Sequence, residues 1–476
     1  MRFFIALLFA AVPAAVSAAP YDAVIVGGGL SGLSAAKQLA ASNKTYVVLE
    51  ARDRVGGRVE NMKLENGGVT EVGAEFVGPT QNKVLALAKE LNLEVYDTYN
   101  EGKNVLWQDG KRQLFDAGGP LGALPPEDPT TLLQLASAQS ALDKLAQRIN
   151  IDAPWTSQGA AELDSESVED WLRKRHISED AHKVMELAIV EIFSADLKGL
   201  SMLYVATYVA AAGDRGSVGT FERLTQTKNG AQAQRIKGGT GLLATRLAKK
   251  LGKHSIKLES PVASIARGDQ KNSTYTVTTK SGKEYRGRHI IVAMSPPMAE
   301  KIEFQPELPA SRRAVQQKMK MGSIGKGIAV FKTPFWRKKG LSGQVLSDDF
   351  VTRATFDGTP YGADYGVVMS FIQAEQMRAK DDASDDELQK ALTKALGHYF
   401  GKEKPQSFLF KRWDNEEYSG GGPTANAAPG VFYKHGSALR KAVGNLHFAG
   451  TESSDHWIGY MDGAIRAGVR AAREVK

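Results

Sequence analysis

The sequence predicts an α/β protein in which a Rossmann-like domain is interleaved with an α+β domain that has a mixed or antiparallel sheet and a helical roof. Residues 22–26 form a short apolar run, and glycines with the spacing G-x-G-x-x-G follow it directly. Residues 30–41 then have a helical pattern, and residues 46–49 form a second apolar strand. At 476 residues the chain is also too long for one ordinary core. We therefore expect a buried parallel sheet and a second domain.

The glycines Gly27, Gly29 and Gly32 each have a separate role in this motif. The first allows a tight turn, the second lets the backbone approach a pyrophosphate, and the third lets the helix pack closely on the strand. Ser31 lies at the start of that helix, whose N–H groups face the phosphates. Glu50 follows the second strand, 23 residues after Gly27, where a carboxylate binds ribose hydroxyls. Together these features predict a bound dinucleotide; the alternative is a chance glycine spacing.

The segment RDRVGGR at residues 52–58 indicates which dinucleotide is bound. It resembles the R-x-G-G-R segment of flavin-containing amine oxidases, in which this segment wraps the FAD pyrophosphate. Gly57 allows backbone N–H groups to approach the same phosphates as the guanidinium of Arg58. The resemblance adds Ala51 and Arg52 to the FAD-binding residues and implies an FAD-binding domain of the GR2 type.

The segment GAEFVGPTQN at residues 73–82 resembles the G-G-x-Y-V-G-P-T-Q-N signature of the monoamine oxidases. In that family the segment passes beside the flavin ring, which implies flavin contacts for Ala74, Glu75 and Phe76. Phe76 stands where the family usually has tyrosine, so an aromatic face is kept in the substrate cavity and a hydroxyl is lost.

Lys326 is a lysine among apolar residues in a predicted strand over residues 321–331. Burying a lysine is costly unless it is hydrogen-bonded or its pKa falls. The resemblance implies a catalytic lysine that is joined through a water to flavin N5. The alternative is an edge-strand lysine that reaches solvent.

Residues 411–423 resemble the family segment W-x(4)-Y-S-G-G-C-Y, which implies flavin contacts for Trp413 and Tyr418. In the family the cysteine anchors the flavin covalently, and the second tyrosine is one wall of an aromatic cage. Here those positions are Gly422 and Pro423. We therefore expect non-covalent FAD and a cage that has lost one wall.

The C-terminal segments FAGTE and HWIGYMDGAI are nearly identical to the family's F-A-G-T-E and W-x-G-Y-M-[ED]-G-A. Tyr460 matches the surviving wall of the cage and would orient the amine. Gly459 and Met461 start a helix whose N–H groups point at the electron-rich end of the flavin. The other flavin-binding residues that these segments imply are Gly450, Thr451 and Glu452.

Between about residues 96 and 235 the pattern changes to helical segments with polar breaks, at residues 132–149, 168–175, 181–193 and 200–212. We expect them to roof the substrate cavity, to which Gln232 contributes. The chain then returns to the nucleotide domain: Val262 matches the family valine that contacts adenine, a hairpin is predicted at residues 275–287, and a strand follows at 289–294. The expected domains are an FAD-binding domain (20–95, 237–311 and 416–476) and a substrate-binding domain (96–236 and 312–415).

Composition excludes several classes of function. The net charge of +8 is spread over short basic groups without interleaved aromatic residues, so nucleic acid is not an expected partner. The chain has no cysteine, so no disulfide can form and no thiolate can bind a metal or attach a flavin. No metal site is expected. Asn43 and Asn272 begin glycosylation sequons, of which only Asn272, in a polar hairpin, looks usable.

Residues 1–18 have the pattern of a signal peptide, with Arg2 before an apolar run and small residues near Ala18. This predicts a protein that is secreted, periplasmic or in the secretory-pathway lumen, without a membrane anchor after cleavage. The alternative is an uncleaved anchor.

The resemblance implies FAD-dependent oxidation of a small amine, with O₂ reduced to hydrogen peroxide, by an enzyme that could form a homodimer. Two alternatives stay open. An L-amino-acid oxidase of the same fold would need an arginine in the cavity, and Arg223 is the candidate. A flavoprotein dehydrogenase would pass electrons to a protein acceptor instead. The sequence does not identify the amine.

Overall fold

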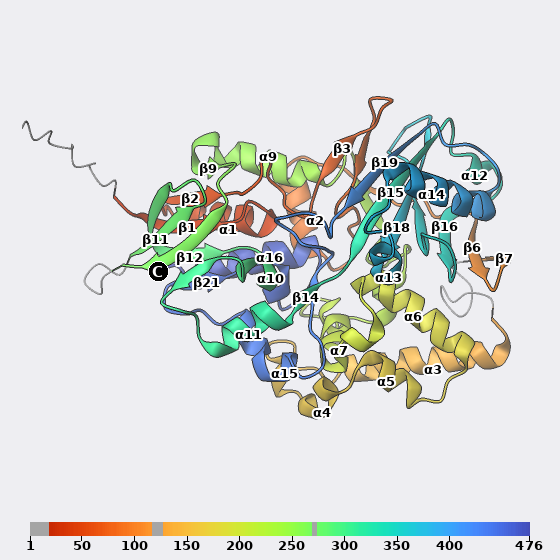
Figure 1. The fold of residues 1–476 in the computed structure, drawn as a ribbon, viewed down its shortest axis with the longest axis horizontal. Coiled ribbons are helices and arrows are strands. Elements are labelled where there is room, and N and C mark those ends of the chain that lie inside the picture. Colours follow the sequence, from red (N-terminus) through yellow and green to blue (C-terminus); the bar gives the residue numbers. More distant parts are fainter. Residues whose placement is uncertain (1–18, 117–126, 269–273) are drawn as a thin grey trace, which may run out of the picture.

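The computed structural model describes residues 19–116, 127–268 and 274–476 (Figure 1). The predicted signal peptide and the Asn272 sequon lie outside the described residues. Within them, no helix has both the length and the hydrophobicity needed to cross a membrane.

In the described part of the chain, the first sheet has eight strands in the order β13-β10-β11-β12-β1-β2-β9, with β21 beside β12. Strand β1 (Tyr21–Val26) runs parallel to both β2 (Tyr46–Leu49) and β12 (Glu284–Val292). This confirms the predicted buried parallel strand. The other strands are β9 (Ile256–Lys257), β10 (Val262–Arg267), β11 (Tyr275–Thr279), β13 (Glu303–Gln305) and β21 (Leu446–Phe448).

Strand β12 is longer than the sequence suggested. Its first half pairs antiparallel with β11, as the predicted hairpin requires, and its second half pairs parallel with β1 and β21. The two short strands expected at residues 284–287 and 289–294 are therefore one strand. The two halves read as separate because their residues have different surroundings: the N-terminal half alternates between buried and exposed, whereas the end is fully buried.

The second sheet has, among the described residues, seven strands in the order β19-β15-β18-β17-β16-β6-β7. Helix α14 (Asp385–Phe400) packs its apolar side chains against one face of it (Figure 1). Most neighbours are antiparallel, and β16 and β6 are parallel. The strands are β6 (Lys103–Gln108), β7 (Lys111–Phe115), β15 (Ile324–Phe331), β16 (Leu341–Ser347), β17 (Ala354–Asp357), β18 (Gly366–Gln373) and β19 (Ser407–Arg412).

The hairpin of β6 and β7 corrects the expectation that residues 96–235 contain only helical segments. Asp109 and Gly110 both have positive φ in the connection between the two strands. This Asp-Gly pair is a strong hairpin signal. The hairpin adds to the edge of the second sheet, so residues far apart in sequence complete one sheet.

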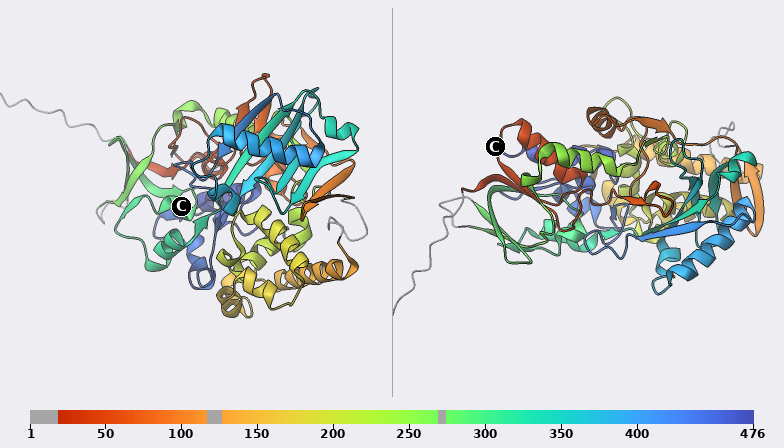
Figure 2. Two further views of the ribbon diagram at one scale, coloured as in Figure 1. Left: turned by 45° about the vertical axis from the view of Figure 1, so that its right-hand side comes forward. Right: turned by 90° about the horizontal axis from the view of Figure 1, so that it is seen from above.

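A helical layer lies below the second sheet in the view of Figure 1, and Figure 2 shows it from two further sides. Helix α7 (Met202–Ala211) is buried along its whole length, as its apolar sequence predicted. Around it lie α3 (Pro129–Ala146), α4 (Ala160–Ser165), α5 (Val168–Arg173), α6 (Glu179–Phe193) and α8 (Phe221–Thr225). Residues 425–439, which the sequence assigned to the nucleotide domain, contribute several apolar side chains to the same core.

The first sheet is covered by α1 (Leu30–Ala41), which packs on α16 (Met461–Arg473). The remaining α-helices and strands of the described residues are α2 (Asn82–Glu90), α9 (Gly241–Leu251), α10 (Pro296–Ala299), α11 (Ala310–Lys318), α12 (Phe335–Lys338), α13 (Ala374–Arg378), α15 (Phe432–His435), β3 (Asn61–Lys63), β4 (Val69–Glu71), β5 (Val95–Asp97), β8 (Gln234–Ile236), β14 (Lys320–Met321) and β20 (Ala425–Asn426).

Candidate active site

One cavity is lined by residues of the first sheet, the second sheet and the helical layer. Its volume of about 350 Å³ falls in the range of small-molecule sites. Nearly all the site residues that the sequence predicts line it. The exceptions are Gly32 and Glu452, which lie behind the wall.

The glycine loop forms one end of the cavity. Gly27 has φ of +108°, and a Cβ there would lie 2.6 Å from the carbonyl oxygen of Ala293. A Cβ on Gly32 would lie 1.9 Å from the carbonyl oxygen of Gly27, so only glycine lets α1 start so close to β1. The Ser31 hydroxyl accepts a hydrogen bond from the Gly450 N–H at 2.9 Å, which joins the loop to the C-terminal motif.

Glu50 lies at the same end and is 3% exposed. Its carboxylate accepts hydrogen bonds from the N–H of Gly28 at 2.6 Å and of Arg52 at 2.9 Å. These bonds fix a carboxylate on the cavity wall at the position expected to bind ribose hydroxyls.

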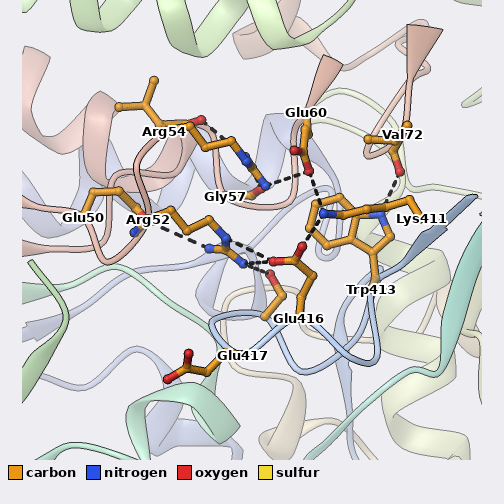
Figure 3. Close-up of polar contacts among 12 residues, drawn as sticks. Glu50, Arg52, Arg54, Gly57, Glu60, Val72, Lys411, Trp413, Glu416 and Glu417 are labelled. Atoms are coloured by element: carbon orange, nitrogen blue, oxygen red, sulfur yellow. Dashed lines mark hydrogen bonds and ion pairs between the residues drawn. The ribbon is translucent and has the colours of Figure 1, made fainter. Parts of the chain in front are cut away.

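An ion-pair network connects the segment after Glu50 to residues 411–419 (Figure 3). Arg52 donates to Glu416 Oε2 at 3.0 Å and to Ser419 Oγ at 2.9 Å. Arg54 donates to Glu60 Oε2 at 2.8 Å, and Lys411 pairs with both Glu60 and Glu416. Two motifs that are distant in sequence are thus held together beside the cavity.

Arg58 reaches the opposite side of the site. It donates to Glu452 at 2.6 Å and 3.2 Å and to the Pro423 carbonyl oxygen at 2.8 Å. Glu452 is almost completely buried, so its role in this structure is to hold the guanidinium of Arg58 against the cavity wall. The expected contact between Arg58 and a phosphate stays a prediction.

The predicted flavin end of the cavity is built on α16. Gly459 has φ of +84°, and a Cβ there would meet the Tyr208 hydroxyl at 2.4 Å. Tyr460 and Met461 follow at the start of the helix, and Thr451 donates to the Tyr460 carbonyl oxygen at 3.0 Å. Trp413, whose indole N–H donates to the Val72 carbonyl oxygen at 2.7 Å, lines the same cavity.

These residues fit an FAD. Bare glycine backbone and a helix N-terminus suit a pyrophosphate, Glu50 suits a ribose, and Val262 lines the cavity as expected for an adenine contact. A second helix N-terminus, that of α16, faces the other end. Among the described residues, no group of three or more histidine, aspartate or glutamate side chains is arranged to hold a metal.

Lys326 is buried and belongs to a cluster of four charged side chains. Its Nζ lies 2.8 Å from Glu75 Oε2 and 3.3 Å from the Glu71 carbonyl oxygen. Arg235 lies 2.7 Å from Glu71 Oε2 and 3.1 Å from Glu75 Oε1. All four are at most 4% exposed. Strand β15 lies between β18 and β19, so the interpretation of Lys326 as an edge-strand lysine that reaches solvent is wrong.

The pKa values of the two carboxyls in this cluster shift in opposite directions. Burial acts to raise the pKa of Glu75, but the nearby charges of Lys326 and Arg235 outweigh it and hold the pKa below its usual value. Burial raises the pKa of Glu71; Arg235 offsets this only in part, and Glu75 adds to it. Lys326 and Glu75 line the cavity as an ion pair.

Phe76, Gln232, Pro423 and Tyr460, which were predicted to form the substrate side, all line the cavity. The centroids of the Tyr460 and Trp457 rings lie 4.9 Å apart at an interplanar angle of 80°, and burial raises the pKa of the Tyr460 phenol. The side chain of Gln232 donates to the Leu224 carbonyl oxygen, while its Oε1 has no hydrogen-bond partner among the described residues.

Tyr208 on α7 and Glu191 on α6 are among the cavity residues that the sequence analysis missed. The Tyr208 ring lies 6.0 Å from that of Tyr460 at an angle of 46°. Glu191 follows Val184 and Leu187 at helical spacing, so a carboxylate on the apolar face of α6 was a signal that could have identified it. Arg223 does not line the cavity and donates to the Ala212 carbonyl oxygen instead. The amino-acid oxidase alternative thus loses its candidate arginine.

This fold and this cavity define a flavin-dependent oxidoreductase of the amine oxidase type, and comparisons with known proteins agree. Residues 30–476 match the family described as flavin containing amine oxidoreductase, and the chain belongs to this family. It is 36% identical to human amine oxidase [flavin-containing] B over 461 residues, which cover 95% of this chain and 86% of that one.

Solved structures with the same fold include the cyclohexylamine oxidase of Brevibacterium oxydans IH-35A. Its TM-score is 0.89 at 32% identity, with 96% of this chain and 99% of that chain covered. A wild-type putrescine oxidase bound to putrescine has a TM-score of 0.89 at 28% identity, with the same coverage. The predicted fold class and the predicted FAD-dependent amine oxidation are therefore confirmed.

Proposed function

We propose that this amine oxidase binds its FAD non-covalently and oxidises an amine larger than a simple alkylamine. The cavity that joins the glycine loop to Tyr460 supports the proposal, because one continuous space provides both nucleotide and substrate positions. When bound, the flavin accepts two electrons from the amine and passes them to O₂, which becomes hydrogen peroxide. The imine product adds water and splits into an aldehyde and ammonia, or into an aldehyde and a smaller amine when the substrate is a secondary amine.

The protein's own residues bind, orient and enclose the reactants. Glu50 and the glycine backbone would hold the ribose and pyrophosphate, and the N-terminus of α16 would stabilise negative charge on the ring. Tyr460 would orient the neutral amine, and Gln232 Oε1 would accept an N–H. Lys326, fixed by Glu75, would hold a water near the reacting centre. Positioning then supplies most of the rate enhancement.

The missing cage wall supports the preference for a larger amine. Pro423 occupies the position of a ring, and its carbonyl oxygen is already bonded to Arg58. The space that a second tyrosine would fill is left to the substrate. A bulkier or secondary amine, whose far end is held by the helical roof, can use that space.

Non-covalent attachment is tested by acid precipitation of the purified holoprotein. Position 422 is glycine and the chain has no cysteine, so yellow flavin should appear in the supernatant. Flavin that stays with the pellet would mean a covalent link to another side chain. A peroxide assay over a graded panel of amines tests the substrate preference.

Export and assembly are part of the proposal. The signal-peptide pattern of residues 1–18 supports a secreted or periplasmic protein, and the mass of the mature N-terminus tests cleavage near Ala18. A homodimer, which light scattering would detect, is the proposed assembly.

A further inference from the structure

Glu191 is an unusual side chain in the cavity wall. It lies in the last turn of α6 (Glu179–Phe193). Its side chain is half-buried, and it lines the cavity. No hydrogen bond or ion pair reaches its carboxylate from any residue that the structure describes. The other carboxylates that line the cavity all have partners: Glu50 has backbone N–H groups, Glu75 has Lys326, and Glu417 has Lys280.

The backbone around Glu191 is fixed from the second sheet. Gln373 on β18 donates to the Glu191 carbonyl oxygen at 3.0 Å and to Ser194 Oγ at 2.9 Å. The N–H of Ser323 donates to the Ser194 carbonyl oxygen at 2.9 Å, and Asn426 donates to that of Phe193 at 3.0 Å. The backbone at the end of α6 is thereby held in place beside the cavity.

This placement destabilises the ionised carboxylate. Burial raises the pKa of Glu191 to about 7. The C-terminal end of a helix also carries partial negative charge, which opposes a carboxylate in the last turn. An unpaired carboxylate in this position is costly to ionise, and a bound cation would offset that cost.

Among the described residues that line the cavity, no basic side chain pairs with Glu191. The basic side chains that line the cavity are engaged elsewhere: Lys326 with Glu75, Arg58 with Glu452, Arg52 with Glu416, and Lys280 with Glu417. Lys301 donates to the Glu417 carbonyl oxygen. The charge that complements Glu191 must therefore come from the ligand.

The cavity that Glu191 lines has apolar walls suited to a hydrocarbon chain. Ile192, Tyr208, Ile324 and Phe371 line it together with Tyr460. Burial, and after it the charge of Glu191, raises the pKa of the Tyr460 phenol. The aliphatic chain of a substrate can lie along these side chains, between the amine that is oxidised and a polar group beside Glu191. We propose that Glu191 binds a second ammonium group of the substrate, so that the preferred substrates are diamines or polyamines oxidised at the end remote from Glu191.

This inference rests on the proposed function, and the experiment separates the two. The probes are an α,ω-diaminoalkane, the n-alkylamine of the same length, and the mono-N-acetyl derivative of the diamine, which keeps the length but loses the second charge. The variants are Glu191→Gln and Glu191→Leu. Glu186→Gln is the matched control, because Glu186 lies on the same helix and does not line the cavity.

For the wild type and Glu186→Gln, the diamine should have a kcat/KM at least about 100-fold above that of the monoamine and the acetylated diamine, as for a desolvated charge pair. Both Glu191 variants should lose this preference because their apparent Kd for the diamine, measured by anaerobic flavin reduction, rises. Their kcat/KM for the monoamine should change far less than their kcat/KM for the diamine.

If the Glu191 variants lost kcat/KM equally on all three probes, the inference would be overturned, because Glu191 would then act on the reacting nitrogen. Equal use of diamine and monoamine by the wild type would overturn it too, while amine oxidation itself would stand. If no amine reduces the flavin, the proposed function fails and the inference with it.

Discussion

Replacing Lys326 with Met tests whether the buried four-charge cluster is a coupled unit. The side chain keeps its length and apolar stem but loses the ammonium that lies 2.8 Å from Glu75. Glu75 would then keep only Arg235, at 3.1 Å, and the cluster would have one uncompensated negative charge. Removing one partner of a buried ion pair typically costs about 3–5 kcal/mol of stability. Because Arg235 remains beside Glu75, we expect this variant to lose about 3 kcal/mol.

A double-mutant cycle gives this prediction its sharpest form. Glu75→Gln alone leaves Lys326 uncompensated and should also cost about 3 kcal/mol. The double variant restores charge balance, so it should cost about 3 kcal/mol in total, a coupling energy of about 3 kcal/mol. With an unfolding entropy of roughly 2 cal/mol/K per residue, each variant should melt about 3 °C lower.

The assay is thermal unfolding at one fixed excess of FAD, because a bound cofactor raises Tm by mass action. Lys332→Met is the control, since this lysine is exposed directly after β15 and should leave Tm unchanged. Additive losses in the double variant, about 6 °C, would refute the reasoning, because the two charges would then not interact.

Three further predictions concern catalysis and pH. Lys326→Met should still bind FAD but should slow turnover, measured as peroxide release; unchanged turnover would return Lys326 to a purely structural role. Pro423→Tyr should shift preference towards small primary amines by restoring the cage wall, and an unchanged ranking over a graded amine panel would transfer specificity to the helical roof. Burial and the neighbouring His447 lower the pKa of His289 to about 4. Between pH 6.5, near the pKa of histidine in the unfolded chain, and pH 4, only the unfolded chain binds this proton. The free energy of unfolding should therefore decrease by about 1 kcal/mol as the pH is lowered through this range, after allowance for solvent screening. His289→Leu should flatten that dependence in denaturant titrations, whereas a change at the exposed His254 should not.

Local signals explain which parts of the fold could be predicted. Strand β1, its glycine turn and helix α1 follow from contiguous residues whose chemistry permits few alternatives, because Gly27 and Gly32 leave no room for a side chain. The helices of the roof follow from apolar spacing. The hairpin of β6 and β7 had a local signal too, the Asp109-Gly110 pair, but the sequence analysis did not use it and described residues 96–235 as helical segments.

The site was predictable where motifs exist and not where contacts are non-local. Lys326 was identified from its strand, yet its partner Glu75 could be assigned only once β15 and the segment after β4 were seen together. Arg235 is a cluster member that no local pattern indicated. Glu191 carried only a weak signal, an acid on an apolar helix face. Its meaning depends on the cavity that three separate parts of the chain enclose.

The central claim is that this cavity couples oxidation of an amine to reduction of a bound flavin. Anaerobic mixing of the holoprotein with a diamine and with the matching monoamine tests it most directly. The flavin's yellow absorbance should bleach, faster with the diamine, and should return when O₂ is admitted, with hydrogen peroxide equimolar to the amine oxidised. A flavin that stays oxidised with every amine offered would contradict the account.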